Sequence, residues 1–322
     1  MKIWDCTMTK DINKTPIIFL LGPTASGKTS LAIRLAQELD TEIISADSRY
    51  LYRELDIGTA KPTEAELQMV KHHLIDVTSV NEIWSLGEYL KAIKEPINNL
   101  HSKGKIPVLV GGTGQYYRAI AQGWQVPKLP PNPALRTAIE NWGNDIGFDA
   151  LHQKLSYIDP NAAVNIDHRN HRRTVRAWEV ILATGELFSE QRQKGETPYK
   201  TLSIGIEWDR PILYERIDKR IDQMFKDGLI EEVKDLMNKG LTDAVKKIGV
   251  IGYAETIAYL ENEISFDDCI MLIKRHTRQF VRRQANWFKP SDPNIHWFKA
   301  TDPAYYEKIL GLIDAFMVSA NQ

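Results

Sequence analysis

One short stretch, GPTASGKTS at positions 22–30, combines the residue types that bind phosphate groups. It matches the pattern G-x-x-x-x-G-K-[ST], with Gly22, Gly27, Lys28 and Thr29 at the fixed positions. The backbone N–H groups of such a loop surround an anion, the lysine adds a positive charge, and the threonine hydroxyl is a ligand for Mg²⁺. The sequence therefore predicts a phosphate-binding loop, and the compound that it binds must be inferred from other residues.

The residues on either side of this loop predict a strand before it and a helix after it. The run IIFLL at 17–21 is apolar throughout and leads directly into the loop. In the following segment, Leu31, Leu35 and Leu39 recur at helical spacing. A bound anion would then lie at a helix N-terminus, where free N–H groups and the helix dipole favour it.

Further apolar segments predict a parallel sheet. Residues 41–47 (TEIISAD) and 105–112 (KIPVLVGG) resemble buried strands, and the intervening residues 86–104 have a helical pattern. Strands that alternate with helices indicate an α/β fold with a parallel sheet. Functional residues of such sheets gather at the carboxyl ends of the strands, where we place Gly22, Asp47 and Gly111.

The character of the sequence changes after residue 122. We interpret residues 126–133 (VPKLPPNP) as a proline-rich hinge and residues 134–195 as helical, and strand character returns at 200–208. The predicted organisation is an α/β core in two parts, 1–122 and 200–322, interrupted by a helical insertion domain at 123–199. Within the second part we predict two long helices, at 214–240 and at 267–288.

The composition is that of an ordinary globular protein, with 43% hydrophobic and 26% charged residues and a net charge of −1. Cys6 and Cys269 are far apart, which argues against a disulfide scaffold or a zinc site. The apolar runs are shorter than the ~20 residues of a membrane helix, and residues 1–14 lack the apolar segment of a signal peptide. We therefore expect a cytoplasmic protein that does not contact membranes, and a monomer.

Two segments contain many cations and few acids. The first has Arg169, Arg172, Arg173 and Arg176 before its first acid, Glu179, and the second has Lys274, Arg275, Arg278, Arg282, Arg283 and Lys289. Solvated helix faces normally mix charges of both signs. Because the guanidinium group suits phosphate oxygens, these stripes predict a polyanionic partner.

Asp47, at a predicted strand end, allows three interpretations: it caps a following helix, it holds magnesium through water, or it is a general base. The strand at 105–112 ends in Gly-Gly-Thr instead of the metal-binding Asp that is common in ATPases. This difference argues against nucleotide hydrolysis. Gly111 and Gly112 suit the close approach of a ligand, and Thr113 adds a hydroxyl beside it.

Seven motifs follow one another along the chain: GPTASGKT (22–29), ADS (46–48), DIGTAKP (56–62), HHLIDV (72–77), GGTGQYY (111–117), RRTVRAWEV (172–180) and RRQANWF (282–288). This set of motifs, in this order, resembles the tRNA dimethylallyltransferase family, also called tRNA isopentenyltransferases, of the bacterial type. The resemblance implies a P-loop NTPase-like core with a helical insertion. It also implies transfer of a dimethylallyl group from dimethylallyl pyrophosphate to N6 of adenosine 37, directly 3′ of the anticodon of a tRNA. The loop would then hold an isoprenoid pyrophosphate, with Mg²⁺ as the cofactor.

The resemblance also implies roles for individual residues. Pyrophosphate is expected at Gly22, Pro23, Thr24, Ala25, Ser26, Gly27, Lys28 and Thr29, with Arg216 or Arg220 completing the site, of which we favour Arg220; the metal ligand is Thr29. The catalytic residues are Asp47 as the base, Lys28 and Thr24. The tRNA anticodon stem-loop is expected at Asp47, Ser48, Arg49, Tyr50, Thr113, Arg136, Arg172, Arg173, Arg176, Gly249 and Gly252. Tyr50 and Ala254 depart from the family pattern, which often has Gln and a basic residue there.

Three other functions remain open at this point. A P-loop small-molecule or nucleotide kinase has the same loop and sheet, but it gives no reason for the arginine stripes. An adenylate isopentenyltransferase performs the same chemistry on free AMP, ADP or ATP, and the insertion and basic helices favour a larger acceptor. A non-catalytic RNA-binding module leaves the loop and Asp47 unexplained.

Overall fold

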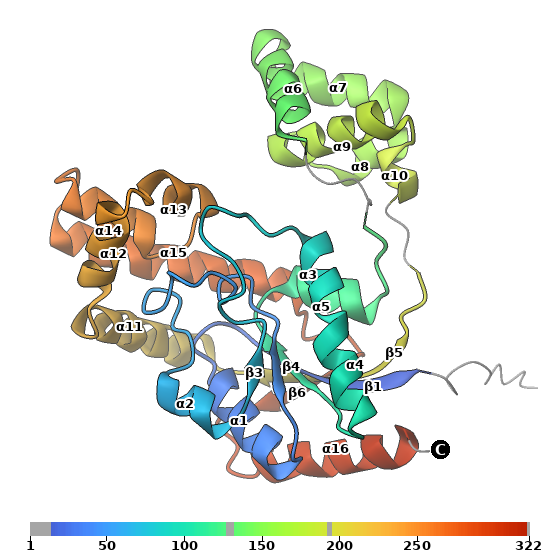
Figure 1. The fold of residues 1–322 in the computed structure, drawn as a ribbon, viewed down its shortest axis with the longest axis vertical. Coiled ribbons are helices and arrows are strands. Elements are labelled where there is room, and N and C mark those ends of the chain that lie inside the picture. The colour runs from blue at the N-terminus through green and yellow to red at the C-terminus, as the bar shows by residue number, and fades with distance from the viewer. Residues whose placement is uncertain (1–13, 127–131, 192–194, 321–322) are drawn as a thin grey trace, which may run out of the picture. The chain divides into compact units, whose positions relative to one another are not determined.

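The structure is a computed structural model that describes residues 14–126, 132–191 and 195–320 (Figure 1). The chain divides into two compact units, one formed by Met1–Ala121 with Pro198–Gln322 and the other by Gln122–Thr197. The N-terminal segment without a signal-peptide pattern lies almost wholly outside the described residues, and so does most of the predicted hinge.

A sheet of six parallel strands forms the centre of the first unit, in the order β3-β2-β4-β1-β5-β6. The strands are β1 (Thr15–Leu21), β2 (Ile43–Ser45), β3 (His72–His73), β4 (Val108–Gly111), β5 (Tyr199–Glu207) and β6 (Ile295–Lys299). The prediction of a parallel α/β sheet is thus confirmed.

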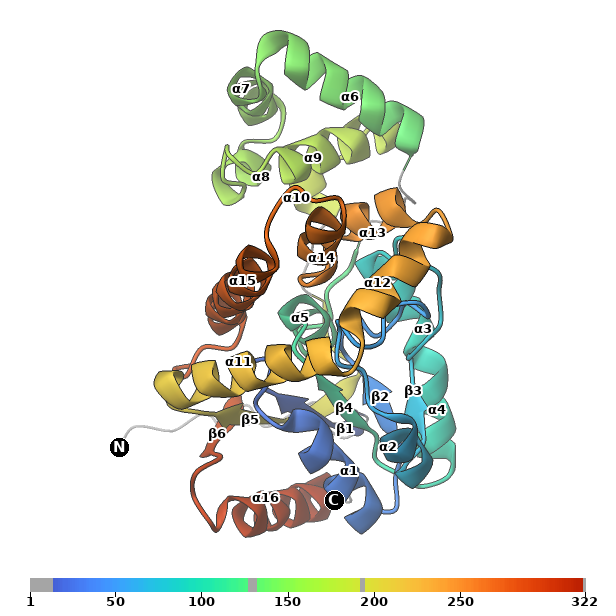
Figure 2. The same ribbon diagram turned by 90° about the vertical axis from the view of Figure 1, so that its left-hand side faces the viewer.

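Helices cover both faces of this sheet (Figure 2). On one face lie α1 (Lys28–Glu38) and α16 (Tyr305–Ala320), and on the other lie α3 (Leu86–Ala92), α4 (Lys94–Ser102) and α5 (Gly114–Ala121). In the central strand β1, Ile18 and Leu20 face α1 and α16, whereas Ile17, Phe19 and Leu21 face α3, α4 and α5. A strand that is buried on both faces must be apolar at every position, and this explains the unbroken run IIFLL.

The remaining helices of this unit are α2 (Glu64–Met69), α11 (Arg210–Lys226), α12 (Leu229–Asn238), α13 (Thr242–Ile248), α14 (Tyr253–Leu260) and α15 (Phe266–Trp287). The prediction of one helix over 214–240 is wrong, because the chain breaks it between α11 and α12. Gly228 has φ +105°, a conformation that glycine adopts readily and that ends a helix. The strands β3 and β6 are not predicted from the sequence, whereas the helix predicted at 267–288 corresponds to α15.

The second unit contains five helices among the described residues: α6 (Pro133–Ile146), α7 (Phe148–Ile158), α8 (Pro160–Asn165), α9 (His171–Thr184) and α10 (Phe188–Gln191). Its core contains Trp178, whose indole N–H donates to the Leu151 carbonyl at 3.1 Å. The two ends of the unit meet, since the Gly195 N–H donates to the Gly123 carbonyl at 3.0 Å.

Candidate active site

The phosphate-binding loop connects β1 to α1 at the carboxyl edge of the sheet. Its two pattern glycines have positive φ, +153° at Gly22 and +88° at Gly27. A Cβ at Gly22 would lie 2.8 Å from the Ile206 carbonyl oxygen of β5. Gly22 therefore cannot be replaced easily, because of its positive φ and its close contact with β5, and Gly27 because of its left-handed backbone.

A cavity of about 390 Å³ opens beside this loop. It is lined by Thr24, Ala25, Ser26, Gly27, Lys28, Thr29, Asp47, Tyr50, Thr59, Val110, Gly111, Gly112, Arg216, Lys219, Arg220, Phe280 and Gln284. The fold thus brings most of the expected pyrophosphate-binding residues together with Asp47. Residues of the turns that follow β2, and residues of β4, α11 and α15, complete the cavity wall. Four of the lining side chains are Lys or Arg.

Lys28 lies among these lining residues, and its ammonium group donates to the Pro23 carbonyl at 2.6 Å. Burial lowers the pKa of Lys28 to about 8; the Asp47 carboxylate opposes this shift and the Arg220 guanidinium adds to it. A lysine in such surroundings is stabilised as a cation when a ligand brings negative charge to the cavity.

Two arginines of α11 are bound to the loop. Arg220 donates to the Thr24 hydroxyl at 3.3 Å and to the Thr59 carbonyl at 3.0 Å. Arg216 donates to the Ala25 carbonyl at 2.9 Å. Both guanidinium groups therefore line the cavity, and Arg220 also connects the loop to the DIGTAKP segment.

Asp47 lies two residues beyond the end of β2. Its Oδ1 accepts the Arg49 N–H at 3.0 Å, and the following residues form turns, with no α-helix before α2 begins at Glu64. The interpretation of Asp47 as a helix cap is therefore wrong. Its carboxylate stabilises a turn through one oxygen and borders the cavity.

The three residues after Asp47 form contacts that differ in kind. The Ser48 N–H donates to the Thr113 hydroxyl at 3.0 Å, and the Arg49 side chain donates to the Ile248 carbonyl at 3.0 Å. The Tyr50 hydroxyl donates to the Ala60 carbonyl at 2.8 Å. Burial raises the pKa of Tyr50 to about 12, so that this hydroxyl stays protonated as a donor. Tyr50 borders the same cavity as the phosphate-binding loop.

Gly249 and Gly252 lie between α13 and α14, with φ values of +66° and +102°. Gly249 ends α13, and Gly252 precedes the first residue of α14. The left-handed backbone between the two helices is the reason that glycine occupies both positions.

The sequence reasoning missed the group that holds the DIGTAKP segment. One carboxylate, Glu232 of α12, accepts the N–H groups of Asp56, Ile57 and Gly58 at 3.1, 2.7 and 3.2 Å. It also accepts the Tyr253 hydroxyl at 2.6 Å. No local pattern around Glu232 indicates this role, because all four donors come from distant segments.

In the second unit, two of the expected tRNA-binding arginines form ion pairs. The buried carboxylate of Glu179 lies 2.9 Å from Arg136 and 2.9 Å from Arg176. Burial alone would raise the pKa of Glu179, but hydrogen bonds from Arg176, the Asn132 N–H and Arg136 outweigh it and lower the pKa. Arg172 is exposed, and it remains the accessible cation of this group together with the half-buried Arg173.

The basic stripe of α15 is partly neutralised by its neighbour. Although the stripe contains no acid, Lys274 pairs with Asp222 of α11 at 2.6 Å, and Arg278 pairs with Asp218. The exposed arginines of the helix are Arg275, Arg282 and Arg283. Reading one helix in isolation thus overstates the positive charge that is accessible.

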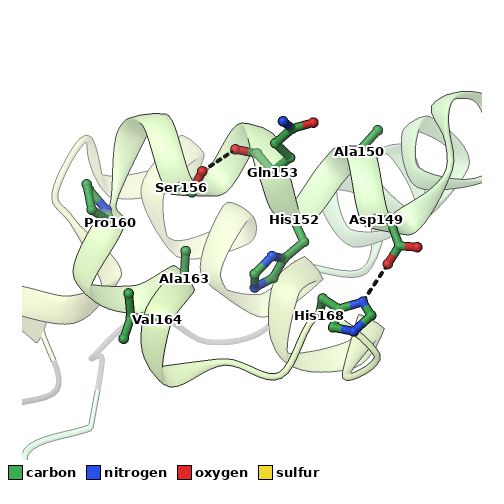
Figure 3. Close-up of a pocket in the computed structure, with 9 residues that line it drawn as sticks. All are labelled: Asp149, Ala150, His152, Gln153, Ser156, Pro160, Ala163, Val164 and His168. Carbon is green, nitrogen blue, oxygen red and sulfur yellow. Dashed lines mark hydrogen bonds and ion pairs between the residues drawn. The ribbon is translucent and has the colours of Figure 1, made fainter.

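A second depression, of about 590 Å³, lies on the helical unit (Figure 3). His168 pairs there with Asp149 at 2.7 Å, and the ring of His152 contacts the Ile166 carbonyl. The other lining residues are Ala150, Gln153, Ser156, Pro160, Ala163 and Val164. Without a lysine or arginine in its lining, this depression is less suited to a polyphosphate than the cavity at the loop.

Over the described residues, no cluster of three or more His, Cys, Asp or Glu side chains is arranged to bind a metal ion. In the same part of the chain, no helix is long and apolar enough to span a membrane.

Comparison with known proteins identifies the family of this chain. The family model described as IPP transferase matches residues 50–291. A tRNA dimethylallyltransferase of Roseiflexus sp. is 45% identical, over 87% of this chain and 92% of that protein. The enzyme of the same name from Bacillus subtilis is 38% identical, over 91% of this chain and 94% of its own length.

Solved structures agree with this result. A tRNA isopentenylpyrophosphate transferase from Bacillus halodurans superposes with a TM-score of 0.70 at 37% identity, covering 96% of this chain and 97% of that one. A eukaryotic dimethylallyltransferase acting on tRNA superposes with a TM-score of 0.81 at 25% identity, covering 95% of this chain and 80% of that one. The chain therefore belongs to the IPP transferase family, the family of the tRNA dimethylallyltransferases.

Proposed function

We propose that this protein transfers a dimethylallyl group from dimethylallyl pyrophosphate to N6 of adenosine 37 of tRNA, and that the cavity at the phosphate-binding loop is its active site. The observation that supports this most directly is the meeting of an anion site and a carboxylate in one cavity. Lys28, Arg216, Lys219 and Arg220 line it together with Asp47.

The cations of the cavity suit a pyrophosphate leaving group. In the reaction the bond between C1 of the allyl group and its bridging oxygen breaks, and the electron pair leaves with pyrophosphate. Donors that are fixed before the reaction stabilise charge that develops as this bond breaks. Lys28 and Arg220 would provide most of this stabilisation, and the Thr24 hydroxyl, which accepts from Arg220, retains its own hydrogen to donate.

Asp47 suits the acceptor side. The N6 amine of adenine is a weak nucleophile because its lone pair is delocalised into the ring, so a base is needed as the new N–C bond forms. The N6 lone pair bonds to C1, and the N6 proton passes to the Asp47 carboxylate. One carboxylate oxygen is fixed by the Arg49 N–H, which orients the group.

Thr29 and the substrate would hold Mg²⁺. Magnesium prefers oxygen ligands and is often bound by one or two protein groups together with substrate phosphates. Thr29 lines the cavity beside the proposed pyrophosphate-binding residues, so its hydroxyl and the substrate phosphate oxygens fit this ion. When bound, the ion would neutralise charge on the pyrophosphate.

The acceptor adenosine must leave the stack of the anticodon loop to reach the cavity. Ser48, Arg49, Tyr50, Thr113, Gly249 and Gly252 of the first unit, and Arg136, Arg172, Arg173 and Arg176 of the second, are the proposed tRNA contacts. Arg136 and Arg176 would act by ordering the helices around Glu179 more than by binding phosphate. We further propose that the protein is cytoplasmic and acts as a monomer.

The test compares substrates directly. Purified protein with Mg²⁺ is incubated with dimethylallyl pyrophosphate and a tRNA anticodon stem-loop, and nucleosides are analysed by mass spectrometry. We expect one adenosine to gain the mass of a dimethylallyl group in place of hydrogen. Free AMP, ADP and ATP serve as competing acceptors, and ATP as a competing donor. Modification of a free nucleotide in preference to the stem-loop, or phosphoryl transfer from ATP, would refute the proposal.

A further inference from the structure

The side chain of Gln284 connects the two sides of the cavity. Gln284 lies on α15 and is 4% exposed. Its carbonyl oxygen accepts the Thr24 N–H of the phosphate-binding loop at 3.1 Å, and its amide nitrogen donates to the Gly112 carbonyl at 3.0 Å. One buried side chain thus holds the loop between β1 and α1 and the turn after β4.

The Thr24 contact reaches the pyrophosphate side. Because its N–H is bound to Gln284, the backbone at Thr24 is fixed from one side, while Arg220 donates to the hydroxyl from the other. The direction of the hydroxyl hydrogen, which is proposed to meet a pyrophosphate oxygen, therefore depends on both contacts.

The Gly112 contact reaches the side of the base. A Cβ at Gly112 would lie 2.3 Å from the Gln284 amide nitrogen, and a Cβ at Gly111 would lie 2.1 Å from the Ala46 carbonyl oxygen. The next residue, Thr113, donates its N–H to that same carbonyl at 3.3 Å. Gln284 is thereby connected, through this packed turn, to the residue directly before Asp47.

Only a group that donates at one end and accepts at the other satisfies both partners. A carboxamide does this, whereas a carboxylate lacks the donor and an apolar side chain lacks both. We propose, on the basis of the proposed function, that Gln284 is a positioning residue that fixes the distance between the pyrophosphate site and the Asp47 carboxylate. It does not take part in a bond-making or proton-transfer step.

The reaction makes this distance important. The N6 atom must meet C1 opposite the departing oxygen, and misplacement by about 1 Å can cost about 10²-fold in rate. Loss of the two Gln284 hydrogen bonds should therefore slow the chemical step, whereas the residues that bind each substrate stay in place and its affinity is retained.

The test replaces Gln284 by methionine, which has a similar shape and no amide. Gln279→Met is the matched control, because Gln279 is exposed on the same helix. The measurements are the single-turnover rate of transfer to an anticodon stem-loop, the KM of each substrate, and thermal stabilisation by inorganic pyrophosphate with Mg²⁺.

We expect Gln284→Met to lower the single-turnover rate by about 10- to 100-fold, to leave both KM values within about threefold, and to retain stabilisation by pyrophosphate. Gln279→Met should match the wild type. A rate within threefold of the wild type would overturn the inference. The inference would also be overturned if the melting temperature and pyrophosphate binding fell along with the rate, because a purely structural role predicts that result. If the wild type itself transfers nothing, the proposed function is refuted and the inference with it.

Discussion

Replacing Asp47 by asparagine separates the remaining roles of this residue. The structure shows Oδ1 accepting the Arg49 N–H at 3.0 Å, and asparagine retains that oxygen in the same place. The turn should therefore keep most of its stability, since an amide oxygen accepts nearly as well there. The variant loses basicity and one negative charge.

The expected loss follows from the proposed proton transfer. A positioned base is worth about 10²–10⁴-fold in rate, which corresponds to about 3–5.5 kcal/mol of activation free energy at about 1.4 kcal/mol per decade. The substitution also changes the charge on the neighbouring Lys28, and the assay must account for this. Asp47 raises the pKa of Lys28, which burial lowers to about 8, so the variant lowers that pKa further. The assay is therefore repeated at lower pH, where Lys28 regains its proton in the variant, and a loss of rate that persists there is due to the missing base.

The assay is single-turnover transfer to an anticodon stem-loop at pH 7, with saturating dimethylallyl pyrophosphate and a magnesium titration. A base predicts a large loss that magnesium does not restore. A magnesium-holding role predicts partial recovery at high metal concentration. Retention of more than about one tenth of the wild-type rate would refute the assignment of Asp47 as the base.

Three further predictions concern cations. Because Lys28 has a pKa of about 8, pyrophosphate affinity should fall as the pH rises through 8, and binding at pH 8 should take up a proton. Calorimetry in buffers of different ionisation enthalpy should show this proton uptake in the wild type. The Lys28→Arg variant stays charged and should show none. Replacing Arg172 and Arg173 by glutamine should weaken stem-loop binding and lower the dependence of log affinity on log salt by up to about one for each phosphate group that the variant no longer binds; an unchanged slope would contradict their role. Replacing Arg176 by glutamine removes a charged partner from the buried Glu179, and should lower the free energy of unfolding by about 1–3 kcal/mol. Denaturant unfolding should show this loss, while the salt dependence of stem-loop binding changes little.

Much of the fold could be predicted from local sequence patterns. The run IIFLL, the loop pattern and the leucines of α1 each report their own surroundings, because burial on both faces and helical periodicity leave a signature within a few residues. Local patterns also place Asp47 at the correct edge of the sheet. They do not show the break at Gly228, because the apolar pattern of α11 resumes in α12 almost in phase.

The partners of charged and polar side chains were not predictable in this way. Gln284 contacts Thr24 across 260 positions of the chain, and Arg136 reaches Glu179 across 43. Either residue, seen in the sequence, belongs to a basic or polar helix and has no visible partner. The acids of α11 likewise neutralise part of α15 although neither segment indicates the other. Such pairs depend on tertiary structure, and a single sequence does not encode them locally.

The hydrogen bond between Gly195 and Gly123 has a consequence for the order of folding. Strand β5 must pair with β1 in the centre of the sheet, although the second unit separates β5 from α5 along the chain. As an unstructured loop of about 75 residues, that segment would cost about 4 kcal/mol of closure entropy beyond a constant, from (3/2)RT ln n. If its helices fold first, the glycine pair brings the ends together and the effective loop shrinks to a few residues. The early folding of the inserted helices would then speed the completion of the sheet, and a circular permutant opened within the insertion should assemble its sheet more slowly than the natural chain.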